Sequence, residues 1–125
     1  MNSKYRITPQ TTNLYNALMD KGIKCKIEDN DGYKTVDISI PEARINIEVD
    51  GLQHFTNPDQ IYADFDRSYW SYKRNNRDTF HIPNTIIDSH LEEVANALTT
   101  VAKRCIKEIE ENNKGFYSWI KKIFK

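Results

Sequence analysis

Cysteine is scarce in this chain of 125 residues, which contains only Cys25 and Cys105. The two lie far apart, and neither belongs to a Cys-x-x-Cys pattern. This argues against a disulfide framework and against a cysteine-based metal site, so both are expected to be reduced, partly buried thiols. Internal repeats and low-complexity tracts are also absent.

Long hydrophobic runs and an excess of charge are missing as well. No apolar stretch approaches membrane-spanning length and no signal peptide opens the chain, so we expect a cytoplasmic protein with no membrane partner. The 18 Lys and Arg residues balance 18 Asp and Glu residues. This balance counts mildly against DNA binding, although local clusters matter more than the sum. With 38% hydrophobic and 29% charged residues, the sequence is typical of one globular domain.

The first half of the chain carries signals for one helix and three strands. Thr8 and Pro9 begin a helix that Gly22 ends. Residues 23–40 alternate like two strands joined by a turn at Asp31-Gly32. A tight turn at residues 41–44 leads into the strand "INIEVD". We therefore expect a three-stranded antiparallel meander.

The second half is predicted to be mostly helical. Asn57 caps a helix that runs to about Arg74, with Pro58 at its first position and Gln60 reaching back to the cap. The stretch "TFHI" is a fourth strand, which Pro83 stops.

A capping box at residues 89–92 then begins a long helix that Gly115 breaks. A last amphipathic helix has one apolar side, made of Phe116, Trp119, Ile120, Ile123 and Phe124. This order predicts an α/β (α+β) sandwich, with helices packed on a small central sheet. Residues 1–7 form a lead-in, residues 8–111 the domain, and residues 112–125 the C-terminal helix.

Three acids on the second and third strands gather on one face. Side chains alternate across a strand, so Glu48 and Asp50 point the same way. A one-residue slip would turn every apolar side chain outward, which fixes the register as Ile40–Ile45, Ile38–Ile47 and Val36–Val49. Asp37 then lies opposite Glu48. Such like-charge pairs are destabilising by roughly 0.2–1 kcal/mol, so the acids indicate either a cation site or a solvated face.

A divalent metal is the cation that fits these acids. Mg²⁺ takes hard oxygen ligands, commonly one or two carboxylates with waters and a substrate phosphate. We expect Asp37 and Glu48 to hold Mg²⁺ or Mn²⁺, together with the carbonyl of Val49. The alternative is a polar sheet face in open water, although a sheet in this layout should be covered on both faces.

Residues after the third strand extend this candidate site. Gly51 allows a sharp turn that brings His54 to the same strand end, where an imidazole can exchange protons with water or a leaving oxygen. Asp64 and Arg67 lie three apart on the next helix and can both face the site. The simpler alternatives are a surface histidine and a helix-surface ion pair.

The helix at residues 58–74 also ends in a basic cluster. Lys73, Arg74 and Arg77 can contact DNA phosphates, or can form a solvated helix end that the helix dipole favours. The aromatic residues of this helix are expected mostly in the core, although an exposed one could stack on a base: they are Phe65, Tyr69, Trp70 and Tyr72.

Three stretches resemble a known family: "VDISIPEARINIEVDGLQHF", "DFDR" and "FHIPNTII". They look like the very short patch repair-type endonuclease fold of the PD-(D/E)xK restriction-endonuclease-like superfamily, over roughly residues 8–100. The resemblance implies a restriction-endonuclease-like core and a DNA endonuclease that depends on Mg²⁺. It also implies catalytic roles for five residues: Asp37 as central metal ligand, Glu48 as the acid of the (D/E)xK half, Asp50 in place of the usual lysine, His54 as the catalytic histidine, and Asp64 as a later acid.

The chain departs from the family on its first helix. Members commonly carry a Glu there, where this chain has Thr11, with Gln10 as the nearest polar substitute. Three hypotheses therefore stay open. The first is a Mg²⁺-dependent deoxyribonuclease, and the second is a nuclease-fold module that binds nucleic acid or a protein without cutting. The third is a toxin or accessory subunit that binds a protein partner, or forms a homodimer, through its C-terminal helix.

Overall fold

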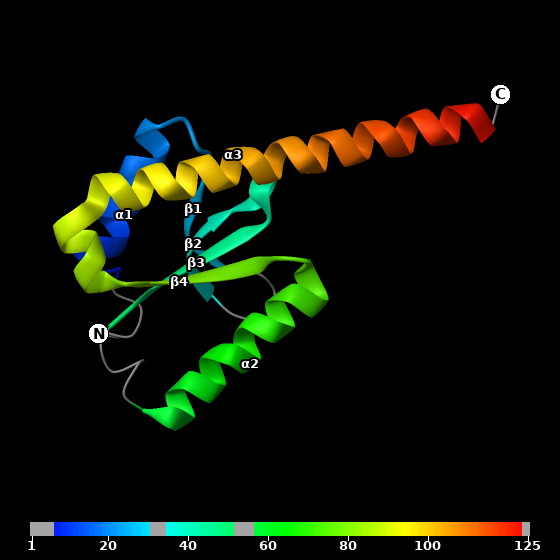
Figure 1. Cartoon of the computed structure of the whole chain (residues 1–125). Coiled ribbons are helices and arrows are strands. Elements are labelled where there is room, and N and C mark those ends of the chain that lie inside the picture. The colour runs from blue at the N-terminus through cyan, green and yellow to red at the C-terminus, as the bar shows by residue number, and fades with distance from the viewer. Residues whose placement is uncertain (1–6, 31–34, 52–56, 124–125) are drawn as a thin grey trace.

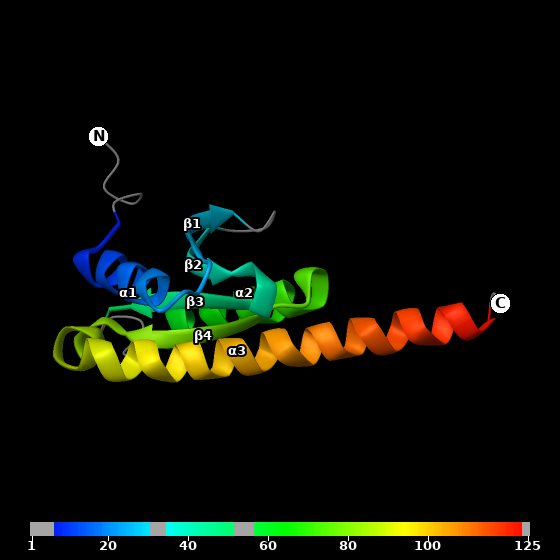
Figure 2. The same ribbon diagram turned by 90° about the horizontal axis from the view of Figure 1, so that it is seen from above.

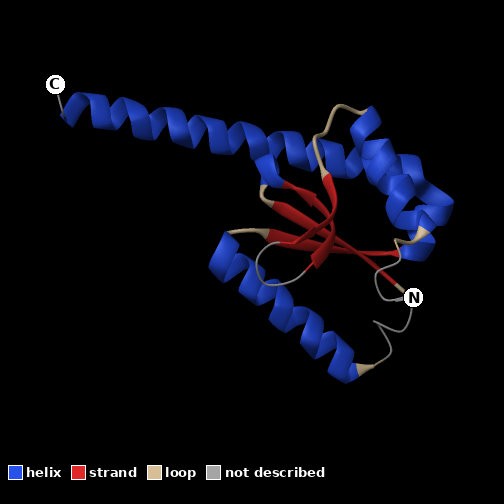
Figure 3. Cartoon of the chain, turned by 180° about the vertical axis from the view of Figure 1, so that it is seen from behind, coloured by secondary structure: helices blue, strands red, loops and turns tan. Residues whose placement is uncertain are grey.

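The computed structural model describes residues 7–30, 35–51 and 57–123. The elements are α1 (Pro9–Asp20), β1 (Lys26–Asn30), β2 (Thr35–Ile40), the 3₁₀ turn η2 (Pro41–Ala43), β3 (Ile45–Asp50), α2 (Pro58–Asn75), β4 (Asp78–Pro83) and α3 (Asn84–Ile123). The strands form one mixed sheet in the order β1-β2-β3-β4. Helices α1 and α3 lie on one face of this sheet and α2 on the other (Figures 1 and 3). The predicted α/β class is confirmed.

The sheet has the predicted antiparallel meander, extended by a parallel strand. Ile38 faces Ile47 across β2 and β3, as the alternation of apolar residues predicted. β1 pairs antiparallel with β2, which confirms the hairpin, although its turn at residues 31–34 lies outside the described residues. β4 pairs parallel with β3, so α2 is the crossover between two parallel neighbours.

Helix α1 begins and ends where its sequence signals lie. The side chain of Thr8 accepts a hydrogen bond from the backbone of Thr11 at 3.3 Å, and Pro9 occupies the first turn. Gly22 follows the helix with φ of +84°, a conformation that favours glycine. The backbone N–H groups of Gly22 and Ile23 donate to carbonyls of the last turn at 3.0 and 3.1 Å. This is the Schellman pattern of helix termination.

The apolar core lies between the sheet and helices α1 and α3. Its buried side chains come from α1, the strands and α3, and include Leu14, Leu18, Ile38, Ile40, Ile45, Ile47, Ile87, Ala95, Leu98 and Ala102. Both cysteines are free thiols, Cys25 buried and Cys105 half-buried, as predicted. Burial raises the pKa of the Cys25 thiol to about 11, which makes it unreactive at neutral pH.

The aromatic residues of α2 were wrongly predicted to lie mostly in the core. Phe65, Tyr69 and Tyr72 are 68%, 51% and 56% exposed. The sheet face beneath α2 is polar, so this helix turns polar side chains such as Asp64 and Ser71 inward and its aromatic side chains outward. The cap at Asn57 is confirmed, because its side chain accepts a hydrogen bond from the backbone of Asp59 at 3.0 Å.

Helix α3 was predicted to break at Gly115, and this prediction was wrong, because the helix continues to Ile123. A glycine costs a helix about 1 kcal/mol relative to alanine, which weakens a helix without ending it. The interruption lies instead at His90, whose φ of −141° and ψ of 43° are not helical. The hydroxyl of Ser89 donates a hydrogen bond to the carbonyl of Thr85 at 3.2 Å. This bond lies within the short helical segment at residues 84–89, before the interruption.

Two neighbouring isoleucines at the start of α3 test this packing. Ile87 is 2% exposed and belongs to the core, whereas Ile86 is 38% exposed. We expect Ile87→Ala to lower the free energy of unfolding by about 2–5 kcal/mol, because it leaves a cavity. Ile86→Ala should cost less than about 1 kcal/mol. Urea denaturation of both variants measures this, and equal losses would contradict the described packing.

Candidate metal centre

A buried polar layer lies between the sheet and α2. β3 alternates strictly, so Ile45 and Ile47 enter the core while Glu48 and Asp50 face α2. These two acids are only 9% and 6% exposed. In the parallel register of β3 and β4, His81 lies beside Glu48. The solvated polar face considered from the sequence is therefore not what the described residues form.

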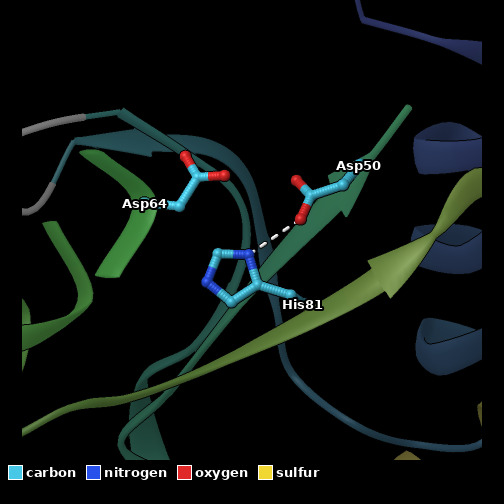
Figure 4. A group of neighbouring side chains, drawn as sticks. All are labelled: Asp50, Asp64 and His81. Atoms are coloured by element: carbon cyan, nitrogen blue, oxygen red, sulfur yellow. Dashed lines mark hydrogen bonds and ion pairs between the residues drawn. The ribbon is translucent and has the colours of Figure 1, made fainter. Parts of the chain in front are cut away.

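Three side chains in this layer come close enough to share one cation. A carboxylate oxygen of Asp50, one of Asp64 and a ring nitrogen of His81 all lie within 4.8 Å of one another. They come from β3, α2 and β4, and converge from three directions (Figure 4). His81 Nδ1 lies 2.8 Å from Asp50 Oδ2. We call these three residues the triad.

Asp64 is oriented by neighbours on its own helix. Gln60 Nε2, four residues earlier, donates to Asp64 Oδ1 at 3.1 Å, and Arg67 Nη2, three residues later, donates to the same oxygen at 2.5 Å. The side chain of Gln60 thus turns toward the site, whereas the sequence predicted that it would reach back to the cap of the helix. Because Asp64 is only 6% exposed, its pair with Arg67 is not a solvated helix-surface ion pair.

His81 is held at both ring nitrogens. Besides Asp50 at Nδ1, Ser68 Oγ of α2 lies 3.1 Å from Nε2. The hydrogen bond to Asp50 raises the pKa of His81, and the charges of Asp50, Glu48 and Asp64 add to this effect against the opposing effect of burial. The ring is therefore biased toward its protonated form in the absence of a metal.

Asp37 and Glu48 lie against each other beside the triad, as the predicted register requires. The pKa of Asp37 is raised to about 7, first by burial and then by the charge and hydrogen bond of Glu48, while a hydrogen bond from the Val49 backbone opposes these effects. That bond joins Val49 N to Asp37 Oδ2 at 2.7 Å and does not involve the Val49 carbonyl, whose expected role as a metal ligand stays a prediction. Asp50 also raises the pKa of Asp37, which couples this pair to the triad.

The basic residues expected to contact DNA differ in their exposure and in their partners within the chain. Lys73 and Arg74 are exposed in the last turn of α2, with Arg74 over the ring of Trp70 at 5.3 Å. Arg77 is half-buried and donates to Asn46 Oδ1 at 3.2 Å. Arg67 is bound to Asp64, as described above. His54 lies outside the described residues.

The first helix contributes no acid to the site. Thr11, at the position where the resemblance described above implied a Glu, is 3% exposed and its hydroxyl lies 2.9 Å from that of Thr8. Gln10 is bound instead to Asp88 of α3, with Nε2 at 3.0 Å from one carboxylate oxygen. The acids of the cluster therefore come from the sheet and α2.

Sequence analysis missed His81 as a member of the site. The strand was recognised, but its parallel pairing with β3 was not, and only this pairing places His81 beside Glu48. One signal was available. Polar Thr79 and His81 alternate with apolar Phe80 and Ile82, which predicts a polar face on this strand.

Comparison with known proteins assigns no family. A scan of the sequence against protein-family models finds no match. Searches of curated proteins and of solved structures find none either. Among the described helices, none is long and apolar enough to cross a membrane. The functional argument therefore rests on the site itself.

Asp37 predicts how stability depends on pH without metal. Its pKa is about 7 in the folded protein and 3.8 as the ordinary value, so between pH 4 and pH 7 the folded state retains a proton that the unfolded state has lost. Stability contributed by this proton is lost as the pH rises through that window. Asp37→Asn removes the penalty and keeps an oxygen for the Val49 N–H. We expect the variant to gain about 1–3 kcal/mol over the wild type between pH 4 and pH 7.

Denaturant unfolding of both proteins, in a metal chelator and across this pH range, measures the difference. The stability that His81 contributes is also lost as the pH rises, but only at and above its ordinary pKa of 6.5. His81 is present in both proteins. It therefore cancels in the comparison to first order. A stability difference that stays constant from pH 4 to pH 7 would contradict a raised pKa at Asp37.

Proposed function

We propose that this chain is a deoxyribonuclease of the restriction-endonuclease-like superfamily, similar to the very short patch repair-type enzymes, which hydrolyses phosphodiester bonds with Mg²⁺ or Mn²⁺. The observation that carries the proposal is the convergence of the triad and the Asp37–Glu48 pair in one buried layer. Three buried carboxyl groups and the half-buried Asp37 repel one another, and a divalent cation would offset that repulsion.

The donors fall into two neighbouring sets that suit these metals. Asp50 and Asp64 offer oxygens and His81 a nitrogen, and a mixed set of this kind is compatible with Mn²⁺ as well as Mg²⁺. Asp37 and Glu48, with the carbonyl of Val49, form the oxygen-only set that the sequence suggested. A cation bound here would stabilise charge on the reacting phosphate and make a water molecule more acidic.

The chain's own residues can then supply orientation and proton transfer. His81 Nδ1 lies 2.8 Å from Asp50 Oδ2, and when the imidazole is protonated one ring proton must leave before it can serve as a ligand. Arg67 holds Asp64 in place, and its side chain is 40% exposed. We retain His54 as the proposed general acid or base, and Lys73, Arg74 and Arg77 as proposed contacts to the DNA backbone.

A second candidate function is a nuclease-fold module that binds nucleic acid or a protein without cutting. The observation that favours it is internal neutralisation. Arg67 binds Asp64 at 2.5 Å and His81 binds Asp50 at 2.8 Å, so both acids have a cationic partner within the chain when His81 is protonated. The absence of an acid at Thr11 points the same way.

Cleavage of supercoiled plasmid separates these candidates. We expect the wild type to nick plasmid in Mg²⁺ or Mn²⁺, and Asp50→Asn and Asp64→Asn each to lose at least about 100-fold of the rate, because each removes a proposed ligand. Asp59→Asn is the matched control, since Asp59 lies on the same helix as Asp64 and is exposed. It should keep wild-type activity.

If the wild type does not cleave plasmid, thermal denaturation with Mn²⁺ distinguishes the remaining explanations. If the wild type does not nick plasmid but Mn²⁺ raises its melting temperature, and Asp64→Asn abolishes that rise, then the metal-binding module is the better description. If Mn²⁺ neither supports cleavage nor stabilises the wild type, the metal site itself is contradicted.

A further inference from the structure

The second half of α3 projects away from the rest of the molecule. The segment at residues 107–123 extends beyond the sheet and the other helices in two perpendicular views (Figures 1 and 2). At 1.5 Å per residue it is about 25 Å long. Trp119 and Ile123 are 59% and 51% exposed. An unpacked helix of this length is only marginally stable in water, so an additional surface would be needed to hold it.

The apolar seam that packs α3 onto the core continues along this projection. Residues spaced alternately by four and three form one face of the helix, beginning with Leu98, Ala102 and Cys105. Leu98 and Ala102 are 7% and 0% exposed against the core. The same spacing continues through Ile109, Asn112, position 116, Trp119 and Ile123. A coiled-coil seam therefore leaves the core and runs into solvent.

We propose that residues 107–123 pair antiparallel with the same segment of a second copy of this chain, with the two-fold axis at Gly115. In an antiparallel coiled coil the two types of core position alternate across the interface. With the axis at Gly115, Ile109 packs beside Trp119 of the partner subunit. Both seams are then covered from the projecting segment to the edge of the core.

Charge complementarity selects a second copy and fixes its direction. Glu108, Gly115 and Lys122 are seven residues apart and flank the seam on one side. In the antiparallel pair Glu108 faces Lys122 of the partner subunit, and the symmetry repeats this contact. A parallel pair would place Glu108 beside the uncharged Asn113 of the partner subunit.

Gly115 is an independent observation for this axis. Its backbone is helical and does not require glycine, and a Cβ at this position would meet nothing within 4 Å apart from its chain neighbours and the backbone of its own helix. Neither conformation nor packing within the chain explains a residue that costs a helix about 1 kcal/mol. At the axis it faces itself, where the absence of a side chain lets two helices approach closely. Asn112 is a polar core position, which in coiled coils specifies register.

Sedimentation equilibrium of the full chain over a wide range of concentration tests the proposal. We expect the wild type to form a dimer, and Glu108→Lys or Lys122→Glu each to raise its dissociation constant about tenfold, because each creates two like-charge contacts. The double variant E108K/K122E should restore the wild-type constant. Glu110→Lys and Lys121→Glu are the matched controls, and should leave the constant within about threefold of the wild type, because their side chains lie outside the seam's flanks.

All four substituted positions are exposed, so the variants should fold, and circular dichroism checks that they do. A chain that stays monomeric at every concentration would overturn the proposal, including one that instead binds a different protein through this helix. A dimer that the controls weaken as much as the test variants do, or that the double variant fails to restore, would overturn it equally.

Discussion

Strand β3 divides the molecule into an apolar and a polar layer, and the positions of the helices follow from that division. Ile45 and Ile47 point to one side and Glu48 and Asp50 to the other. The apolar side is buried by the apolar faces of α1 and α3. The polar side is covered by α2, which must present polar side chains inward, so its aromatic residues face solvent. One alternating strand thus accounts for both the core and the buried acids.

The cluster of acids is both an energetic cost and a functional feature. Burial of the polar layer removes water that would screen its charges, and this burial, together with the nearby charge of Glu48, raises the pKa of Asp37 to about 7. The same desolvation strengthens the attraction of the layer for a cation. Protons and metal therefore compete for one set of groups, with His81 and Asp37 as the two that must release protons. A site of this kind should bind metal more tightly as the pH rises through neutrality.

Local patterns predicted much of the fold, and non-local contacts produced the errors. The alternation of Ile38 and Ile47 fixed the central register, because a slip would expose every apolar residue. Asp50 was predicted in the site because it alternates with Glu48 along one strand, and Asp64 because its spacing from Arg67 lets both face the site from the next helix. His81 was missed because parallel pairing across a helix leaves no local signal of which strands are neighbours. Phe65 was misplaced because burial of aromatic residues was assumed without knowing that α2 covers a polar face.

The most direct test of the metal centre is a crystal structure of the protein grown with Mn²⁺, with data collected for anomalous scattering. The account predicts an anomalous peak within bonding distance of oxygens from Asp50 and Asp64, with the hydrogen bond between His81 and Asp50 broken or rearranged. A peak bound only by Asp37 and Glu48 would keep the metal but move it to the neighbouring set. No peak in the polar layer, with the contact between His81 and Asp50 intact, would contradict the proposal that these acids hold a metal.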